Sequence, residues 1–186
     1  MTALIERNTK LANDIINGDV KINKYRFQIE EACLALIATQ QPTASDLREI
    51  ITILYMIVEI ERMGDYAAGI ATTVILMEVE PLLKIFKIIL KMAEIARHML
   101  SESIQAFMKR NPQLAREIVV RVNEIDTLYK IIFQRLIKLM AKDHDMVTRC
   151  TYLIWCSHNL ERIADRVINI SEQTIFMTMG MLREFE

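Results

Sequence analysis

The stretch ERMGD, residues 61–65, lies inside a long apolar run and recurs 100 residues later as ERIAD, residues 161–165. On a helix, the acids at the two ends of such a stretch share one face, with about 5–6 Å between Cβ atoms, and repel each other. The similarity continues upstream, where Asn8 matches Asn111. The sequence therefore predicts two similar halves, each a helix, a turn and a second helix that carries the acid pair.

The composition favours a protein built of a few long helices. Of 186 residues, 52% are hydrophobic and 25% are charged, and only four glycines and three prolines are available for turns. No segment alternates polar and apolar residues as a strand does, so the predicted fold is all-α. Capping residues and prolines place the predicted helices at about residues 11–38, 44–73, 81–109, 112–141 and 144–178.

Charge, hydropathy and cysteine content exclude several classes of protein. A net charge of −1 without a basic cluster makes nucleic acid a poor candidate partner. The longest apolar run, residues 50–58, is too short for direct membrane insertion. Three cysteines without a Cys-x-x-Cys pair fit reduced thiols in a cytoplasmic protein, which could still lie at the inner face of the membrane through its partners.

The two halves, predicted as residues 1–76 and 77–186, are unequal in length. A full helix precedes Asn111, whereas only seven residues precede Asn8. A unit of two helices leaves an apolar face uncovered. We therefore expect the first bundle to lack most of its first helix, through a late start codon or truncation, or to be covered by another chain.

The repeated acids have two interpretations. Arg62 and Arg162, or arginines elsewhere in the bundle, could pair with them on a solvated edge. Alternatively the acids could bind cations, since oxygen ligands suit Mg, Ca, Mn and iron. An acid at the matching distance on each preceding helix, Asp19 or Asp126, adds to either cluster, although Asp126 could be an ordinary exposed residue. The candidate metal ligands are Glu61, Asp65, Glu161, Asp165, Asp19, Asp126 and Asn169.

Catalysis has little support in the sequence. His158 precedes Glu161, which reverses the Glu-x-x-His order of di-iron bundles. There is no glycine-rich phosphate loop and no nucleophile with an evident base. We expect no enzymatic activity, and a carboxylate-bridged redox enzyme ranks last among the hypotheses.

Four segments in order along the chain resemble the PhoU family of phosphate-responsive regulators. ERMGDYAAGIA and ERIADRVINISE resemble the two signature repeats of that family. EEACLALIATQQPTASDLREI resembles its turn between helices, and EIDTLYKIIFQRL resembles its fifth helix. The resemblance covers essentially the whole chain.

The resemblance implies two pseudo-symmetric three-helix bundles with multinuclear iron or zinc clusters on the Glu-x-x-x-Asp faces, with Mn or Mg as other candidates. It assigns metal binding to both acid pairs and aligns Asp19 with the family's acid on the preceding helix. It also implies negative regulation of phosphate uptake and of phosphate-starvation signalling. The implied partners are the ATPase subunit of a phosphate ABC transporter, a sensor histidine kinase and a second copy of the chain.

The chain departs from the family pattern at four positions. Tyr66 and Arg166 replace the usual histidines, Gly69 replaces an asparagine, and Val122 replaces the acid that aligns with Asp19. Arg166 could place a positive charge beside the second acid pair, so a metal is less expected there. A relative that serves another transporter, or a helical scaffold with arginine-paired acids and no metal, is the alternative.

Overall fold

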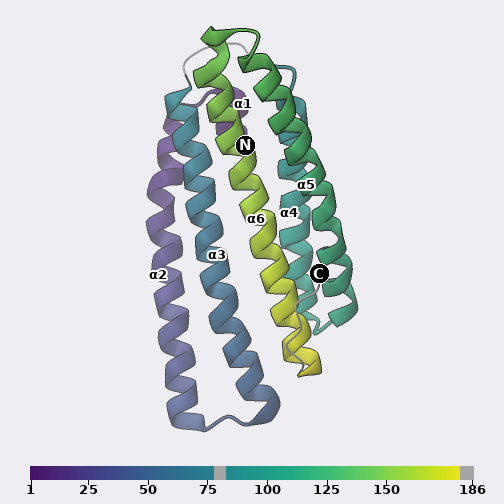
Figure 1. Cartoon of the computed structure of the whole chain (residues 1–186). Coiled ribbons are helices and arrows are strands. Elements are labelled where there is room, and N and C mark those ends of the chain that lie inside the picture. The colour runs from purple at the N-terminus through teal and green to yellow at the C-terminus, as the bar shows by residue number, and fades with distance from the viewer. Residues whose placement is uncertain (78–82, 181–186) are drawn as a thin grey trace.

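The computed structural model in Figure 1 describes residues 1–77 and 83–180 of the chain. This described part contains helices and no strand, which confirms the all-α prediction. None of its helices combines the length and the hydropathy needed to cross a bilayer. The helices are α1 (Thr2–Glu6), α2 (Thr9–Gln40), α3 (Ala44–Leu76), α4 (Phe86–Met108), α5 (Pro112–Met140), a 3-10 turn (His144–Met146) and α6 (Val147–Met179).

Asparagine caps begin α2 and α5, as the sequence predicted. The Asn8 side chain accepts a hydrogen bond from the backbone N–H of Leu11 at 2.9 Å. Asn111 accepts bonds from Gln113 and Leu114, each at 3.1 Å. Such a cap stabilises a helix by about 1 kcal/mol, because it satisfies amides that have no partner within the helix. The same residue type therefore fixes the same boundary in both halves.

One predicted capping box and one predicted helix start need correction, although α3 does begin at Ala44 as predicted. The Thr43 side chain makes no capping hydrogen bond, because the first residue of α3, Ala44, has a left-handed φ of 46°, which departs from regular capping-box geometry. The fourth helix begins at Phe86 rather than at Pro81, which lies outside the described residues. Leu83 accepts a turn hydrogen bond from the Phe86 amide at 2.9 Å, so the chain enters α4 through a turn.

The two acid-bearing helices form the centre of the molecule. α3 and α6 pack against each other in opposite directions, α2 packs on α3, and α4 and α5 pack on α6 and on each other (Figure 1). Side chains from α4, α5 and α6 close the densest part of the core, where Ile89, Ile132 and Leu153 are at most 1% exposed. The second half is therefore a closed three-helix bundle.

The short helix α1 is the counterpart of the last turn of α4. Ala3 accepts a hydrogen bond from the amide of Asn8 at 2.9 Å, and Ala106 accepts one from the amide of Asn111 at 2.8 Å. The residue before each asparagine is an arginine with left-handed φ, 52° in the first half and 49° in the second. The first bundle thus contains only the end of its covering helix.

The two bundles differ in how deeply matching residues are buried. Ile29 on α2 is 38% exposed, whereas its counterpart Ile132 on α5 is fully buried. Among the residues of α2, only Ala12 and Cys33 are buried. In the described structure, the only helix that precedes α2 is the five-residue α1, and most of α2 is accordingly exposed or half-buried.

The three cysteines are unpaired and buried, as reduced core thiols would be. Burial raises the pKa of Cys156 to about 11, so this thiol stays protonated at neutral pH.

Candidate metal-binding acid clusters

The structure brings the predicted acids together in two groups. The first acid cluster consists of Asp19 on α2 with Glu61 and Asp65 on α3. The second acid cluster consists of Asp126 on α5 with Glu161 and Asp165 on α6. Asn169, the seventh predicted ligand, also lies on α6, but its side chain bonds to α3.

A glycine allows Asp19 to approach the backbone of α3. A Cβ atom built on Gly64 would lie 2.7 Å from Asp19 Oδ1, so a larger residue would force the carboxylate away. Asp19 Oδ2 accepts a hydrogen bond from Asn23 at 3.0 Å. Asp19 Oδ1 is buried and has no hydrogen-bond partner in the described part of the protein. An orphaned carboxylate oxygen is costly, and a cation would satisfy it.

The negative charges of the first acid cluster are only partly compensated. Loss of hydration raises the pKa of Asp65, and the charges of Asp19 and Glu61 raise it further. Arg26 donates to Glu61 at 3.2 Å, but it also donates to Glu30 at 3.1 Å. Across the described residues, no arginine, lysine or histidine forms an ion pair with Asp19 or Asp65. Two of the three carboxylates therefore lack a cation.

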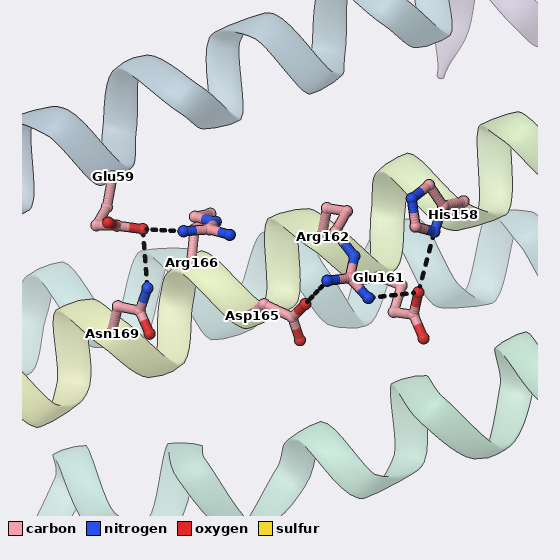
Figure 2. A network of polar contacts seen from close by, with 7 residues as sticks. All are labelled: Glu59, His158, Glu161, Arg162, Asp165, Arg166 and Asn169. Carbon is pink, nitrogen blue, oxygen red and sulfur yellow. Dashed lines mark hydrogen bonds and ion pairs between the residues drawn. The ribbon is translucent and has the colours of Figure 1, made fainter. Parts of the chain in front are cut away.

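Arg162 pairs with both motif acids of the second acid cluster from within α6. Figure 2 shows its guanidinium between the two acids of the motif, 3.3 Å from Glu161 and 3.1 Å from Asp165. His158, one turn earlier, approaches Glu161 at 3.2 Å. In the second acid cluster, the motif acids are therefore paired with an arginine, as the first of the two interpretations expected. In the first half, Arg62, the counterpart of Arg162, lies 3.6 Å from Glu59 instead.

Opposing effects act on the pKa of Asp165. Burial raises it, Arg162 lowers it, and the charges of Glu161 and Asp126 raise it, with a net upward shift. Asp126 is therefore close enough to interact with the motif acids. Val122, which stands in place of Asp19, leaves this cluster without a second acid at the matching position of the preceding helix.

Glu59, which the sequence analysis did not single out, links the two halves. Its Oε2 accepts hydrogen bonds from Arg166 at 3.1 Å and from Asn169 at 3.0 Å, both across the α3–α6 interface (Figure 2). Arg166 therefore pairs with α3, although its charge still lowers the pKa of Asp165. The sequence could have indicated Glu59, because another polar residue, Asn159, stands at the matching position 100 residues later.

The reciprocal contact explains one departure from the family pattern. Asn159 faces Gly69 as Glu59 faces Asn169, and a Cβ atom on Gly69 would lie 2.8 Å from Asn159 Nδ2. The glycine thus gives the asparagine amide the room that a larger residue would occupy. The paired contacts are what a two-fold relation between the halves requires.

The two clusters differ in how well they fit a metal ion. Within the described ranges, no group of three or more His, Cys, Asp or Glu side chains is already arranged to hold one. The first acid cluster has suitable hard oxygen ligands and an oxygen that lacks a partner, so its chemistry fits a cation. The second does not fit as it stands, because Arg162 occupies both motif carboxylates.

Comparisons with known proteins agree with the resemblance seen in the sequence. A family model described as the PhoU domain matches residues 1–74 and 89–174. Phosphate-specific transport system accessory protein PhoU homologues from Clostridium acetobutylicum and Rhizobium meliloti are 35% and 34% identical. The matches cover 97% and 96% of this chain, and 83% and 76% of the relatives.

Two crystal structures share the fold. The phosphate transport system regulatory protein PhoU from Streptococcus pneumoniae matches with a TM-score of 0.92 and 32% identity, over 99% of this chain and 86% of that one. PhoU from Pseudomonas aeruginosa matches with a TM-score of 0.92 and 30% identity, over 96% and 86%.

Proposed function

The chain belongs to the PhoU family, and from this premise we propose that it is a regulatory accessory protein of a phosphate-specific transport system. In this role it negatively regulates phosphate uptake and phosphate-starvation signalling. The observation that carries the proposal is the similarity, along 97% of the chain, to a relative named as a phosphate-specific transport system accessory protein. The relatives are named as accessory proteins of a transport system, so the proposed role is regulation rather than catalysis.

The proposed partners are the ATPase subunit of a phosphate ABC transporter and a sensor histidine kinase, with self-association as a homodimer. These partners would hold the protein at the cytoplasmic face of the membrane. The name of the relatives, accessory proteins of a transport system, supports a transporter partner.

We further propose that iron or zinc, or failing these Mn or Mg, binds at the first acid cluster. Asp19, Glu61 and Asp65 would hold the ion, which would supply the positive charge that these carboxylates lack. The supporting observations are the unpartnered Asp19 Oδ1 and the raised pKa of Asp65. At the second acid cluster, Glu161, Asp165, Asp126 and Asn169 could bind an ion only if Arg162 and Glu59 released their present partners.

Metal analysis of the purified full-length chain tests the metal proposal. The Glu61→Ala/Asp65→Ala variant should lose the iron or zinc that the wild type retains. The matched control is Glu161→Ala/Asp165→Ala, which should retain it. Equal metal content in wild type and first-cluster variant would overturn the proposal.

Deletion of the gene in its own host tests the regulatory proposal. At high external phosphate, loss of a negative regulator should raise phosphate uptake and alkaline phosphatase expression. Complementation with the wild-type chain should restore both. Unchanged uptake and expression in the deletion strain would contradict the proposed role.

A helical scaffold that binds no metal is the competing proposal, and the paired guanidinium of Arg162 favours it for the second half. The two proposals differ in their response to a chelator. A ligand that binds only the folded chain must stabilise it, so chelation should lower the melting temperature of a metal protein. An unchanged melting temperature would favour the scaffold.

A further inference from the structure

A pocket of about 300 Å³ opens between the C-terminal part of α3 and the N-terminal part of α6. Gly69, Thr72 and Leu76 line it from α3, and Trp155 and Asn159 line it from α6. We call it the α3–α6 pocket. None of the candidate metal ligands lines it, so it is separate from both acid clusters. Its volume lies at the lower end of the range for small-molecule sites, which are mostly apolar and hold a few polar groups.

The pocket is open because Gly69 has no side chain. The matching place in the other half of the molecule is filled, because Asn169 stands at the position of Gly69 and donates to Glu59 at 3.0 Å (Figure 2). Opposite Gly69, the Asn159 amide forms no hydrogen bond within the described part of the chain. A side-chain amide offers donors and an acceptor side by side. These groups of Asn159 are therefore available to a ligand.

The Trp155 indole forms an aromatic wall of the pocket. Trp155 is 50% exposed, and Tyr152 contacts it edge to face, with ring centroids 5.6 Å apart and 61° between the ring planes. An exposed indole is a surface on which another planar ring stacks. Tyr55, the matching aromatic residue on α3, is 56% exposed but does not line the pocket. The pocket thus combines a stacking surface with an available amide.

The charges around the pocket favour an uncharged ligand. Among the described residues that line it, none is an acid, a lysine or an arginine. His158 also lines it, but its Nδ1 lies 3.2 Å from Glu161 (Figure 2). The carboxylate accepts a hydrogen bond from Nδ1–H, which leaves Nε2 of the neutral ring as an acceptor. A phosphate or carboxylate ligand would therefore meet no lysine or arginine and would lie near the negative charge of Glu161.

We propose that the α3–α6 pocket binds the adenine ring of an uncharged purine nucleoside. The ring stacks on Trp155, and its N6 amino group and N7 form paired hydrogen bonds with the Asn159 amide. Asparagine recognises adenine through these two atoms in nucleic acids, and bases of any kind stack on aromatic side chains. The inference goes beyond the proposed regulatory role and does not depend on it.

Fluorescence titration of the full-length protein tests the proposal. Trp155 is the only tryptophan of the chain, so quenching of its emission reports on this pocket directly. Adenosine should quench with a Kd of about 0.1–1 mM, since one stacked base with two hydrogen bonds gives modest affinity. Inosine, which has a carbonyl oxygen in place of the amino group, should bind about tenfold more weakly, because one of the paired hydrogen bonds is lost. AMP should bind no more tightly than adenosine, because its phosphate finds no cationic partner.

Matched substitutions, measured by calorimetry, distinguish the pocket from other surfaces. Trp155→Leu should abolish measurable adenosine binding, whereas Tyr55→Leu should bind as wild type does. Asn159→Ala should weaken adenosine binding about tenfold and remove the preference over inosine. Gly69→Asn should block adenosine, because it places an amide in the pocket as Asn169 does in the other half. Circular dichroism should show the same helix content in all four variants.

Four results would each overturn the proposal. The first is the absence of quenching of the wild type at about 5 mM adenosine. The second is a Trp155→Leu variant that binds adenosine as tightly as wild type. The third is equal quenching by uridine and adenosine, which would indicate nonspecific stacking. The fourth is an affinity for AMP more than about tenfold higher than for adenosine, which would mean that the pocket selects an anion.

Discussion

The two halves of the molecule carry the same motif but balance its charges differently. In the second half, Arg162 contacts both motif acids and a closed three-helix bundle supports them. In the first half, Arg62 contacts Glu59 instead, Asp65 has no paired cation among the described residues, and much of α2 is exposed. The two repeats therefore share the helical fold of the motif but differ in which positive charges pair with its acids.

The largest expected difference between the halves concerns burial. Ile132→Ala should lower the free energy of unfolding by about 3–4 kcal/mol, because it leaves a cavity in a closed core. Ile29→Ala, the matching change on α2, should cost about 1 kcal/mol or less, because solvent already reaches that side chain. Urea denaturation of both variants measures the difference, and equal costs would mean that the face of α2 that carries Ile29 is covered in solution.

Removing the central arginine tests charge compensation. Arg162→Ala should destabilise the protein by about 1–2 kcal/mol at neutral pH, because two carboxylates one turn apart lose their shared partner. The matched change, Arg62→Ala, should cost under about 0.5 kcal/mol, since that side chain is half exposed and its pairing is long. Equal losses in urea denaturation would refute the difference between the clusters.

The link between the halves should be measurable as a coupling energy. A double-mutant cycle of Glu59→Ala and Asn169→Ala should give an interaction of about 1 kcal/mol, because the amide bonds to a charged acceptor. The cycle of Glu59→Ala with Arg62→Ala should give less, because this pair is 3.6 Å apart and the Arg62 side chain is half exposed. A coupling near zero between Glu59 and Asn169 would argue against the contact in solution.

The smallest expected effect on stability concerns Asp65, which has no ion-pair partner among the described residues. The folded-state pKa of Asp65 lies above its unfolded value, so folding favours the protonated form. The protonated form therefore stabilises the folded state at acidic pH. This stabilisation is lost as the pH rises from the ordinary pKa of a carboxyl group to the raised pKa of Asp65. Asp65→Asn should therefore raise the stability of the metal-free protein at pH 7, by less than about 0.5 kcal/mol, and should have little effect at acidic pH.

Added metal should reverse the sign of that effect. Bound iron or zinc would stabilise the wild type more than Asp65→Asn, because the variant loses a ligand. Thermal unfolding across pH, with and without the ion, measures both results. A destabilised metal-free variant at neutral pH would contradict the assigned electrostatics.

The fold was largely predictable because its signals are local. Asparagine caps set the starts of α2 and α5, and periodic apolar residues set their extent. The capping box at Thr43 failed because the backbone of Ala44 departs from regular helix geometry, which a residue pattern does not report.

The acid clusters were predictable in membership but not in pairing. Spacing along each helix brought Glu61 and Asp65 together, and the distance from the turn identified Asp19. The choice of partner depends on which rotamer each arginine adopts and on contacts between α3 and α6. Arg166 does place a positive charge near Asp165, as expected, but its hydrogen-bond partner is Glu59, a residue that the repeat alone did not single out.

A crystal structure of the full-length chain grown with zinc or iron, with anomalous diffraction recorded at the metal edge, tests the central claim most directly. The unequal compensation predicts an anomalous peak among Asp19, Glu61 and Asp65, while Arg162 remains on Glu161 and Asp165. A peak at the second acid cluster with Arg162 displaced and none at the first, or no peak at either cluster, would contradict it.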